Sequence, residues 1–250
     1  MEFYIFDTID NDNAGFLEDS GFDGVLLTYK VSQGDLITKV AADCHKHKNI
    51  KYLVAIRPYT ISPQYLYMIN KSLKPMCNDR FQVNLISGWA SEDEKKFGGI
   101  IGDVNESSSS TEKSNYLINY VNILNDLKYK DIDFYVSVTN NFVFDATKNN
   151  KLIISYTHYL KNLKNIKNLE NIMVSIVPIL RKNKSELKRV DKNLKTTDTQ
   201  LFTYDDFNIF LNDLKNNGIK QVLFHDSYSH NEKKEIAEFV KQYKELQKTI

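Results

Sequence analysis

Polar residues follow short apolar segments at eight points along this 250-residue chain, and many of them carry hydrogen-bond donors. In chain order they are Asp7-Thr8, Tyr29-Lys30, Arg57-Pro58, Ser87-Gly88-Trp89, Thr139-Asn140, Tyr156-Thr157-His158, Arg181 and His225-Asp226. If the apolar segments are the parallel strands of a barrel, these residues meet at the carboxyl ends of the strands, where barrel active sites lie. A barrel end lined by these residues suits a ligand that is held by hydrogen bonds.

The spacing of histidines, cysteines and carboxylates argues against a metal site. His45 and His47 are two residues apart on an expected helix, so their side chains face different sides. The chain also has no HExxH, CxxC, GxSxG or GxxxxGK[ST] pattern. We therefore expect no metal centre, and the metallohydrolase, P-loop and serine-hydrolase classes are disfavoured.

Eight β-type segments would position these polar residues. Each is short, apolar and bounded by polar or turn residues. They are Glu2–Asp7, Asp23–Tyr29, Lys51–Arg57, Phe81–Ser87, Asp133–Val138, Leu152–Tyr156, Asn171–Leu180 and Lys220–His225.

Helix-like segments alternate with these strands, which predicts a parallel sheet. The expected helices are Asp35–Lys48, Ser62–Met76, Thr111–Leu127, Tyr204–Asn216 and Asn231–Leu246. Eight repeats in 250 residues match a (β/α)8 TIM barrel. A doubly wound sheet is the alternative, but the residues Thr8-Ile9-Asp10-Asn11-Asp12 after the first strand do not match its GxGxxG fingerprint.

The barrel is expected to be reduced in its helices. Only Asn13–Ser20 is available for the first helix, and residues 139–151 leave room for about two turns. The loop Glu92–Ser110 is either a flexible connection or a lid. No Pro/Gly-rich linker interrupts the chain, so we expect residues 1–250 to form a single domain.

Composition narrows the partners and the compartment. The formal net charge is +1, so neither nucleic acid nor an acidic membrane surface is expected as a partner. No apolar run approaches the roughly 18 residues of a membrane span. Cys44 and Cys77 are the only cysteines, and the N-terminus does not read as a secretory signal. We expect free thiols and a cytoplasmic protein.

The segment Lys51–Trp89, KYLVAIRPYTISPQYLYMINKSLKPMCNDRFQVNLISGW, resembles a known family. In the luciferase-like flavin-dependent monooxygenases, most closely the alkanesulfonate monooxygenase type, a run similar to RYLVAIRP…SP…DR(L/F)…N(V/L)(V/I)(T/S)G spans barrel strands three and four. FDGVLLTY and GIKQVLFHDSYSHNE resemble the family's second strand and its final strand and loop. The resemblance implies a TIM barrel that binds FMN.

The resemblance also implies which residues bind the flavin. Asn84, Ser87 and Gly88 resemble the family positions that line it. Thr139 and Asn140 stand where the family has a small-residue loop that holds the phosphate, although Ser137-Val138-Thr139-Asn140 replaces its Gly-Gly-Ser-Ser. Alternatively, Asn84 is a core amide bonded to a neighbouring loop, and Thr139-Asn140 is a plain turn.

His225, Tyr228 and His230 are the candidates for proton transfer, because Tyr228 and His230 match a tyrosine and a histidine of the family. The family tyrosine is an active-site residue. His158 is a second candidate, assigned to the substrate pocket. Each histidine could instead be a loop residue with ordinary hydrogen bonds.

Two further residues are assigned to substrate binding. Arg57 lies at a strand end, where it can bind an anion bidentately or pair with a loop carboxylate. Trp89 either walls the flavin or substrate pocket or caps the barrel rim.

At several positions this sequence differs from the family pattern, and these differences limit which family functions can be expected of it. Its Arg-x-His on strand seven aligns with Ser175-Ile176-Val177, and its cysteine after strand two aligns with Gln33. Its Glu-Arg-Tyr appears as Glu112-Lys113-Ser114, and its long insertion is reduced to roughly Lys182–Thr203. An alkanesulfonate is therefore not the expected substrate.

Three functions remain open. In the first, a monooxygenase takes reduced FMN from a separate reductase and uses O₂ on a small organic or peptide-derived substrate. In the second, the chain is a catalytically degenerate flavin-binding protein or the supporting subunit of a heterodimer. In the third, it is a barrel hydrolase or aldolase without flavin, with Lys30 as a Schiff-base lysine.

The resemblance further implies a homodimer, or a heterodimer with a related barrel, formed through helices of the second and third units. The expected helix Ser62–Met76 carries Tyr65, Tyr67 and Met68, a composition that fits an interface.

Overall fold

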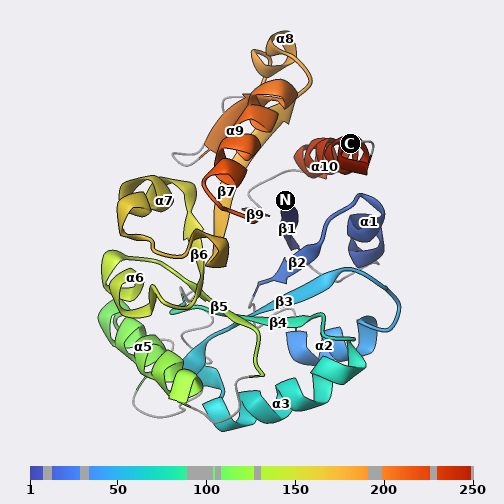
Figure 1. The fold of residues 1–250 in the computed structure, drawn as a ribbon. Helices are drawn as coiled ribbons and strands as arrows, with labels where there is room; N and C mark the ends of the chain where they lie inside the picture. Colours follow the sequence, from blue (N-terminus) through green and yellow to red (C-terminus); the bar gives the residue numbers. More distant parts are fainter. Residues whose placement is uncertain are drawn as a thin grey trace. The chain divides into compact units, whose positions relative to one another are not determined.

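The computed structural model describes residues 1–7, 13–28, 34–88, 104, 108–126, 131–190, 199–225 and 230–248. Its strands, labelled in Figure 1, are β1 (Glu2–Asp7), β2 (Gly24–Leu27), β3 (Lys51–Ile56), β4 (Phe81–Leu85), β5 (Phe134–Ser137), β6 (Lys151–Ser155), β7 (Ile172–Arg181), β8 (Thr199–Thr203) and β9 (Gln221–Phe224). Their order is β6-β5-β4-β3-β2-β1-β9-β7-β8, and β6 also pairs with β7. This is the order of a (β/α)8 TIM barrel with one additional strand, β8, and it confirms the predicted fold class.

Contacts within the chain divide it into two compact units, which are described separately. The central unit spans Leu26–Ile153, and the split unit consists of Met1–Val25 and Ile154–Ile250. All the strand segments expected from the sequence correspond to strands of the barrel. β8 was not predicted.

Parallel strands β3, β4 and β5 form the middle of the central unit. Ala55 of β3 pairs with Asn84 of β4, which in turn pairs with Tyr135 of β5. Because side chains alternate along a strand, Ala55 and Asn84 face one side, and Val54 and Ile56 face the other. Around these strands lie α2 (Leu36–Asp43), α3 (Pro63–Met76), α5 (Ser110–Asp126) and α6 (Asn141–Thr147) (Figure 1).

The helix starts of the central unit follow from capping residues. Ser62 accepts a hydrogen bond from the backbone N–H of Tyr65 (3.2 Å), with Pro63 as the first helical residue. Ser109 and Glu112 exchange hydrogen bonds with each other's backbone N–H groups at 3.2 and 2.7 Å, a capping box at the start of α5. These caps fix which residues of α3 and α5 face the strands.

The split unit contains β1, β9, β7 and β8. Its helices are α1 (Asn13–Asp19), α7 (Tyr156–Asn162), α8 (Lys184–Leu187), α9 (Tyr204–Asn216) and α10 (His230–Lys248). The ten-residue strand β7 changes partner along its length, because Met173–Ile176 pair with β9 and Val177–Arg181 pair with β8. Rings of Phe3, Phe207, Phe224 and Phe239 pack in its core.

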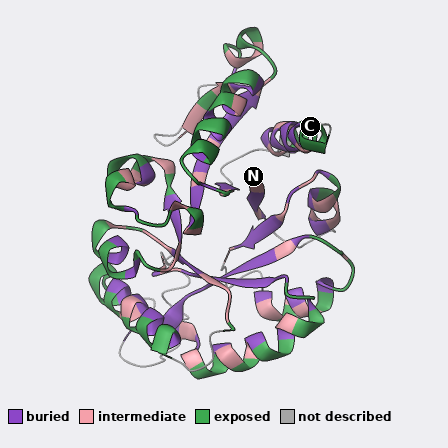
Figure 2. Cartoon of the chain, in the orientation of Figure 1, coloured by how far each residue is buried: buried purple, intermediate pink, exposed green. Residues whose placement is uncertain are grey.

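Burial follows the alternation of strands and helices. Figure 2 shows strands that are mostly buried and helices with one buried and one exposed face. This is the pattern of amphipathic helices packed on a sheet. Among the helices that the structure describes, none is long and apolar enough to span a membrane.

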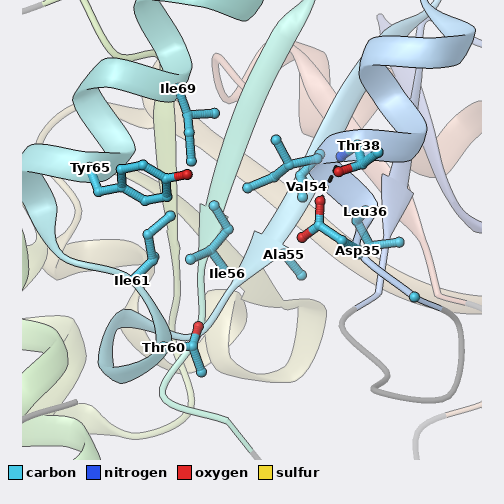
Figure 3. A pocket seen from close by; sticks show the side chains of 12 residues that line it. Asp35, Leu36, Thr38, Val54, Ala55, Ile56, Thr60, Ile61, Tyr65 and Ile69 are labelled. Atoms are coloured by element: carbon cyan, nitrogen blue, oxygen red, sulfur yellow. Dashed lines mark hydrogen bonds between the residues drawn. The ribbon is translucent and has the colours of Figure 1, made fainter. Parts of the chain in front are cut away.

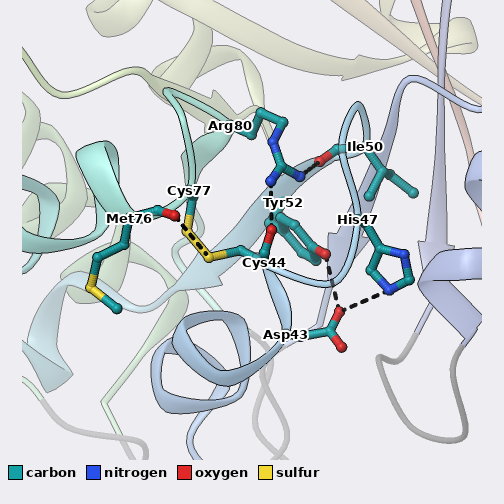
Figure 4. The surroundings of a disulfide bond; sticks show 8 residues. All are labelled: Asp43, Cys44, His47, Ile50, Tyr52, Met76, Cys77 and Arg80. Carbon is teal, nitrogen blue, oxygen red and sulfur yellow. Dashed lines mark hydrogen bonds and ion pairs between the residues drawn. A yellow bond between two sulfur atoms is a disulfide. The ribbon is translucent and has the colours of Figure 1, made fainter.

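The prediction of free thiols is wrong in this structure, because Cys44 and Cys77 form a disulfide with Cα atoms 5.3 Å apart (Figure 4). Both sulfur-bearing side chains are buried. Cys44 caps the C-terminus of α2, and Cys77 caps that of α3. The cysteines are 33 residues apart in sequence, and composition alone does not reveal that two helix ends bring them together.

Candidate functional site

Six of the predicted site residues gather at the carboxyl ends of β3, β4 and β5 in the central unit. They form a continuous polar cluster with contacts from one strand end to the next. The six are Arg57, Asn84, Ser87, Gly88, Thr139 and Asn140.

Asn84 lies inside the sheet with 2% of its surface exposed. Its Oδ1 accepts a 2.9 Å hydrogen bond from the hydroxyl of Ser137 on β5. Since this bond engages the carbonyl oxygen, the amide N–H₂ is the group of Asn84 that can donate to a ligand. The oxygen of Asn84 thus behaves as the alternative expected of a core amide. Its partner, however, is a strand residue and not a loop residue.

The end of β4 is joined to the end of β5 by hydroxyl groups. Ser87 Oγ and Thr139 Oγ1 are 3.4 Å apart. Asn140 caps α6, its Oδ1 accepting from the N–H of Val143, and its Nδ2 donates to Ser114 Oγ at 3.5 Å. The loop after β5 is thus anchored at both residues, and it presents hydroxyl and amide groups.

Gly88 is held against two large buried side chains. Its φ is +85°, and an added Cβ would lie 2.6 Å from Tyr59 Oη and 3.1 Å from Arg57 Cδ and Nε. Only a residue without a side chain fits at this position. The backbone of Gly88 is therefore close to both the Arg57 guanidinium and the Tyr59 hydroxyl.

Sequence reasoning missed three members of this cluster, namely Tyr59, Lys113 and Ser114. Lys113 lies on the first turn of α5 with 6% of its surface exposed, and its Nζ is 5.7 Å from the centre of the Tyr59 ring. Such a cation over an aromatic ring is attracted to it. A sequence signal was present, because Lys113 is four residues before buried Leu117 and shares its helix face.

Two cations, Arg57 and Lys113, are therefore buried within the same polar cluster. Arg57 is 2% exposed. A cluster that combines two cations with hydroxyl and amide donors is suited to an anionic group such as a phosphate.

The remaining predicted residues are not part of this cluster as the structure describes it. His225 follows β9 in the split unit, where its N–H donates to Ile176 O (2.8 Å) and its ring centre is 4.3 Å from that of Phe6. His230 is the first residue of α10. Trp89 and Tyr228 lie outside the described residues.

His158 lies on the first turn of α7, not in a loop. Its N–H donates to Ser155 Oγ at 3.3 Å. Burial, followed by the positive charge of Lys161, lowers the pKa of His158 below its ordinary value. A neutral imidazole at neutral pH can accept a proton, which is compatible with the proton-transfer role considered for this residue.

Two ion pairs attach α10 to strand ends in the split unit. Arg181 binds Glu232 bidentately at 2.5 and 2.8 Å, and this hydrogen bonding raises the pKa of Arg181. Lys233 Nζ lies 3.0 Å from Asp7 Oδ2. These polar strand-end residues, Asp7 and Arg181, therefore hold the helix instead of presenting free charges.

Among the described residues there is no group of three or more histidines, cysteines or carboxylates that could hold a metal ion.

Comparison with known proteins supports the fold of the chain. No family model matches the sequence, and no curated relative matches it significantly. Three similar solved structures are an EDTA monooxygenase from Chelativorans sp. BNC1, the oxygenating constituent of 3,6-diketocamphane monooxygenase from Pseudomonas putida in complex with FMN, and the coenzyme F420-dependent tetrahydromethanopterin reductase from Methanopyrus kandleri.

These structures align over nearly the whole chain. The EDTA monooxygenase has a TM-score of 0.67 and 10% identity, covering 100% of this chain and 93% of its own. The camphane enzyme has a TM-score of 0.61 and 14% identity, with 96% of both chains covered. The reductase has a TM-score of 0.64 and 13% identity, covering 96% and 97%. At such identity the likeness shows the fold alone, and it is the fold expected from the family resemblance.

Proposed function

We propose that this chain is an FMN-dependent monooxygenase that uses reduced flavin and O₂ on a small organic or peptide-derived substrate. The observation that carries the proposal is the polar cluster at the ends of β3, β4 and β5, with its two buried cations. Its composition fits a phosphate-bearing cofactor.

Particular residues would hold the flavin. The Lys113 ammonium, the Thr139 hydroxyl and the Asn140 amide would bind the phosphate, and the Asn84 amide and Ser87 hydroxyl would bind the polar edge of the ring. The flavin, when bound, supplies the activation of oxygen. The protein positions the substrate and excludes water from the site.

The partners follow from the same proposal. A separate reductase supplies the reduced FMN. The enzyme acts as a dimer, and light scattering measures this oligomeric state. An alkanesulfonate is disfavoured as substrate, because the family's Arg-x-His is replaced by Ser175-Ile176-Val177 on β7. Arg57 is the residue we assign to an anionic group of the substrate.

Flavin binding provides the first test. When FMN is titrated with the protein, we expect the fluorescence of FMN to fall and to reach a constant value at saturation. Lys113→Met should weaken FMN binding about tenfold while leaving riboflavin binding unchanged, since riboflavin has no phosphate. Lys71→Met, at an exposed position of α3, is the matched control and should change neither. A protein that binds no FMN would contradict the proposal and favour the flavin-free hydrolase or aldolase.

Catalysis is tested separately with reduced FMN. After mixing with O₂, the return of the absorbance of oxidised flavin should be slower with the protein than without it, because the site shields the flavin from water. FMN binding without any such delay would favour the degenerate flavin-binding protein over the enzyme.

A further inference from the structure

A cavity lies beside β3 in the central unit. Its volume is about 650 Å³, and it lies between α2, β3 and α3 (Figure 3). Val54, Ala55 and Ile56 of β3 all line it; Val54 and Ile56 face away from the side on which Ala55 pairs with Asn84. None of the six residues of the polar cluster at the ends of β3, β4 and β5 lines this cavity.

The walls of this cavity are mainly apolar. Figure 3 shows Ile61, Tyr65 and Ile69 on the α3 side and Leu36 on the α2 side, and the β3 side chains form the floor between them. A volume of about 650 Å³ is in the usual range for small-molecule sites, about 300–1,000 Å³. The cavity opens to solvent, since its lining residues Asp35, Thr38 and Tyr65 are exposed.

Polar groups are confined to a few positions at its edge. Asp35 and Thr38 lie at the start of α2, and the hydroxyl groups of Thr60 and Tyr65 face the cavity from the α3 side. Asp35 Oδ1 accepts a 2.7 Å hydrogen bond from the N–H of Thr38, so its carboxylate already occupies the anion-binding N-terminus of the helix. Among the described residues that line the cavity, Asp35 is the one charged residue, which disfavours a second anion and favours a cation.

The disulfide holds the two helix walls in place. Cys44 and Cys77 join the C-terminal ends of α2 and α3, whereas Asp35 and Tyr65 line the cavity near their N-terminal ends. A wall fixed at one end needs little ordering when a ligand enters, which favours binding.

We propose that this cavity is a binding site for an amphipathic amine. The apolar body of the ligand lies against Ile56, Ile61 and Ile69, and its ammonium group lies beside Asp35. The Asp35 carboxylate disfavours a carboxylate or phosphate headgroup here, in contrast to the flavin site with its buried cations.

Three ten-carbon probes with different headgroups test the headgroup preference by isothermal titration, below their micelle concentrations. Decylammonium should bind saturably with one site per chain, and at least about tenfold more tightly than decanoate. Asp35→Asn keeps a good N-cap residue and removes the charge. It should weaken decylammonium binding about fivefold and leave decanol binding unchanged. Equal affinity for decanoate, or no saturable binding, would overturn the proposal.

A cavity-filling substitution tests the location. Ile69→Trp should abolish decylammonium binding, whereas Met68→Trp, at an adjacent position that is 56% exposed and does not line the cavity, should not. Urea unfolding of both variants checks the fold independently of the flavin proposal. If the wild-type chain is a dimer that binds no amine and Ile69→Trp makes it monomeric, a second copy covers this face and the ligand proposal is wrong.

Discussion

Replacing Gly88 by alanine is the sharpest test of the candidate site. The new Cβ would lie 2.6 Å from Tyr59 Oη and 3.1 Å from two atoms of Arg57. Both neighbours are almost fully buried, so neither can move aside into solvent. The backbone at φ +85° adds strain, because this conformation disfavours any residue with a side chain.

The cost can be estimated in two parts. A non-glycine residue in the left-handed region costs about 1–2 kcal/mol. Overpacking against the buried ring and guanidinium adds about 1–3 kcal/mol. We therefore expect Gly88→Ala to lower the free energy of unfolding by about 2–5 kcal/mol in urea unfolding.

Gly218→Ala is the matched control for the backbone part. Its φ is +90°, and the nearest atom to an added Cβ is Leu169 Cβ at 3.6 Å, an ordinary contact. This substitution should cost only the backbone strain, about 1–2 kcal/mol. The difference between the two variants measures the close approach of Gly88 to Tyr59 and Arg57.

A double-mutant cycle identifies the atom responsible. Tyr59→Phe removes the hydroxyl that lies nearest the new Cβ, so Gly88→Ala should be less costly in that background, by about 1 kcal/mol. Two results would refute the reasoning. One is equal destabilisation by Gly88→Ala and Gly218→Ala, and the other is strict additivity of Gly88→Ala with Tyr59→Phe.

Three further predictions concern other parts of the chain. Cys44→Ser combined with Cys77→Ser should lower the free energy of unfolding by about 3–4 kcal/mol, since the closed loop spans 33 residues, and reduction of the wild type should do the same; a reductant-insensitive wild type would contradict this. Glu232→Gln should cost about 3 kcal/mol in urea unfolding, because it removes the carboxylate that binds Arg181 bidentately in a mostly buried pair, and a loss below about 0.5 kcal/mol would place the pair among weak surface contacts. The folded-state pKa of His158 is lowered, so its contribution to stability is present above about pH 6.5 and is lost as pH falls through the folded-state pKa; NMR titration should give a midpoint below 6.5, and His158→Gln should remove this part of the pH dependence.

The alternation of apolar segments was sufficient to predict the eight barrel strands, because each is a short buried run between turn residues. β8 was missed for a physical reason. Thr199–Thr203 is a partly exposed strand that pairs only with the second half of β7, so it lacks the apolar signature of a buried strand. Helix α7 was missed because Tyr156-Thr157-His158 directly follows a strand and reads as its end.

The predicted site residues that lie together in the structure are those whose position the strand ends determine. The register that pairs Ala55 with Asn84 also aligns the ends of β3 and β4, which brings Arg57 to Gly88. Lys113 and Tyr59 were missed because their roles depend on contacts between separate elements, the first turn of α5 and the turn after β3. Sequence spacing does not report which turn faces which helix.

The geometry of β7 shows which side chains replace the family's Arg-x-His. Ser175 and Val177 lie on one side of the strand and are half-buried, whereas Ile176 between them is buried on the other side. Where sulfonate enzymes of the resembling family have a cation and an imidazole, this face therefore carries a hydroxyl and two methyl groups. Val177 is also where β7 leaves β9 and begins to pair with β8, so this position lies inside a sheet. In the central unit, the proposed flavin site offers Arg57 and Lys113 as counter-charges for an anionic group, so Lys113→Met and Arg57→Met are the substitutions that separate cofactor binding from substrate binding.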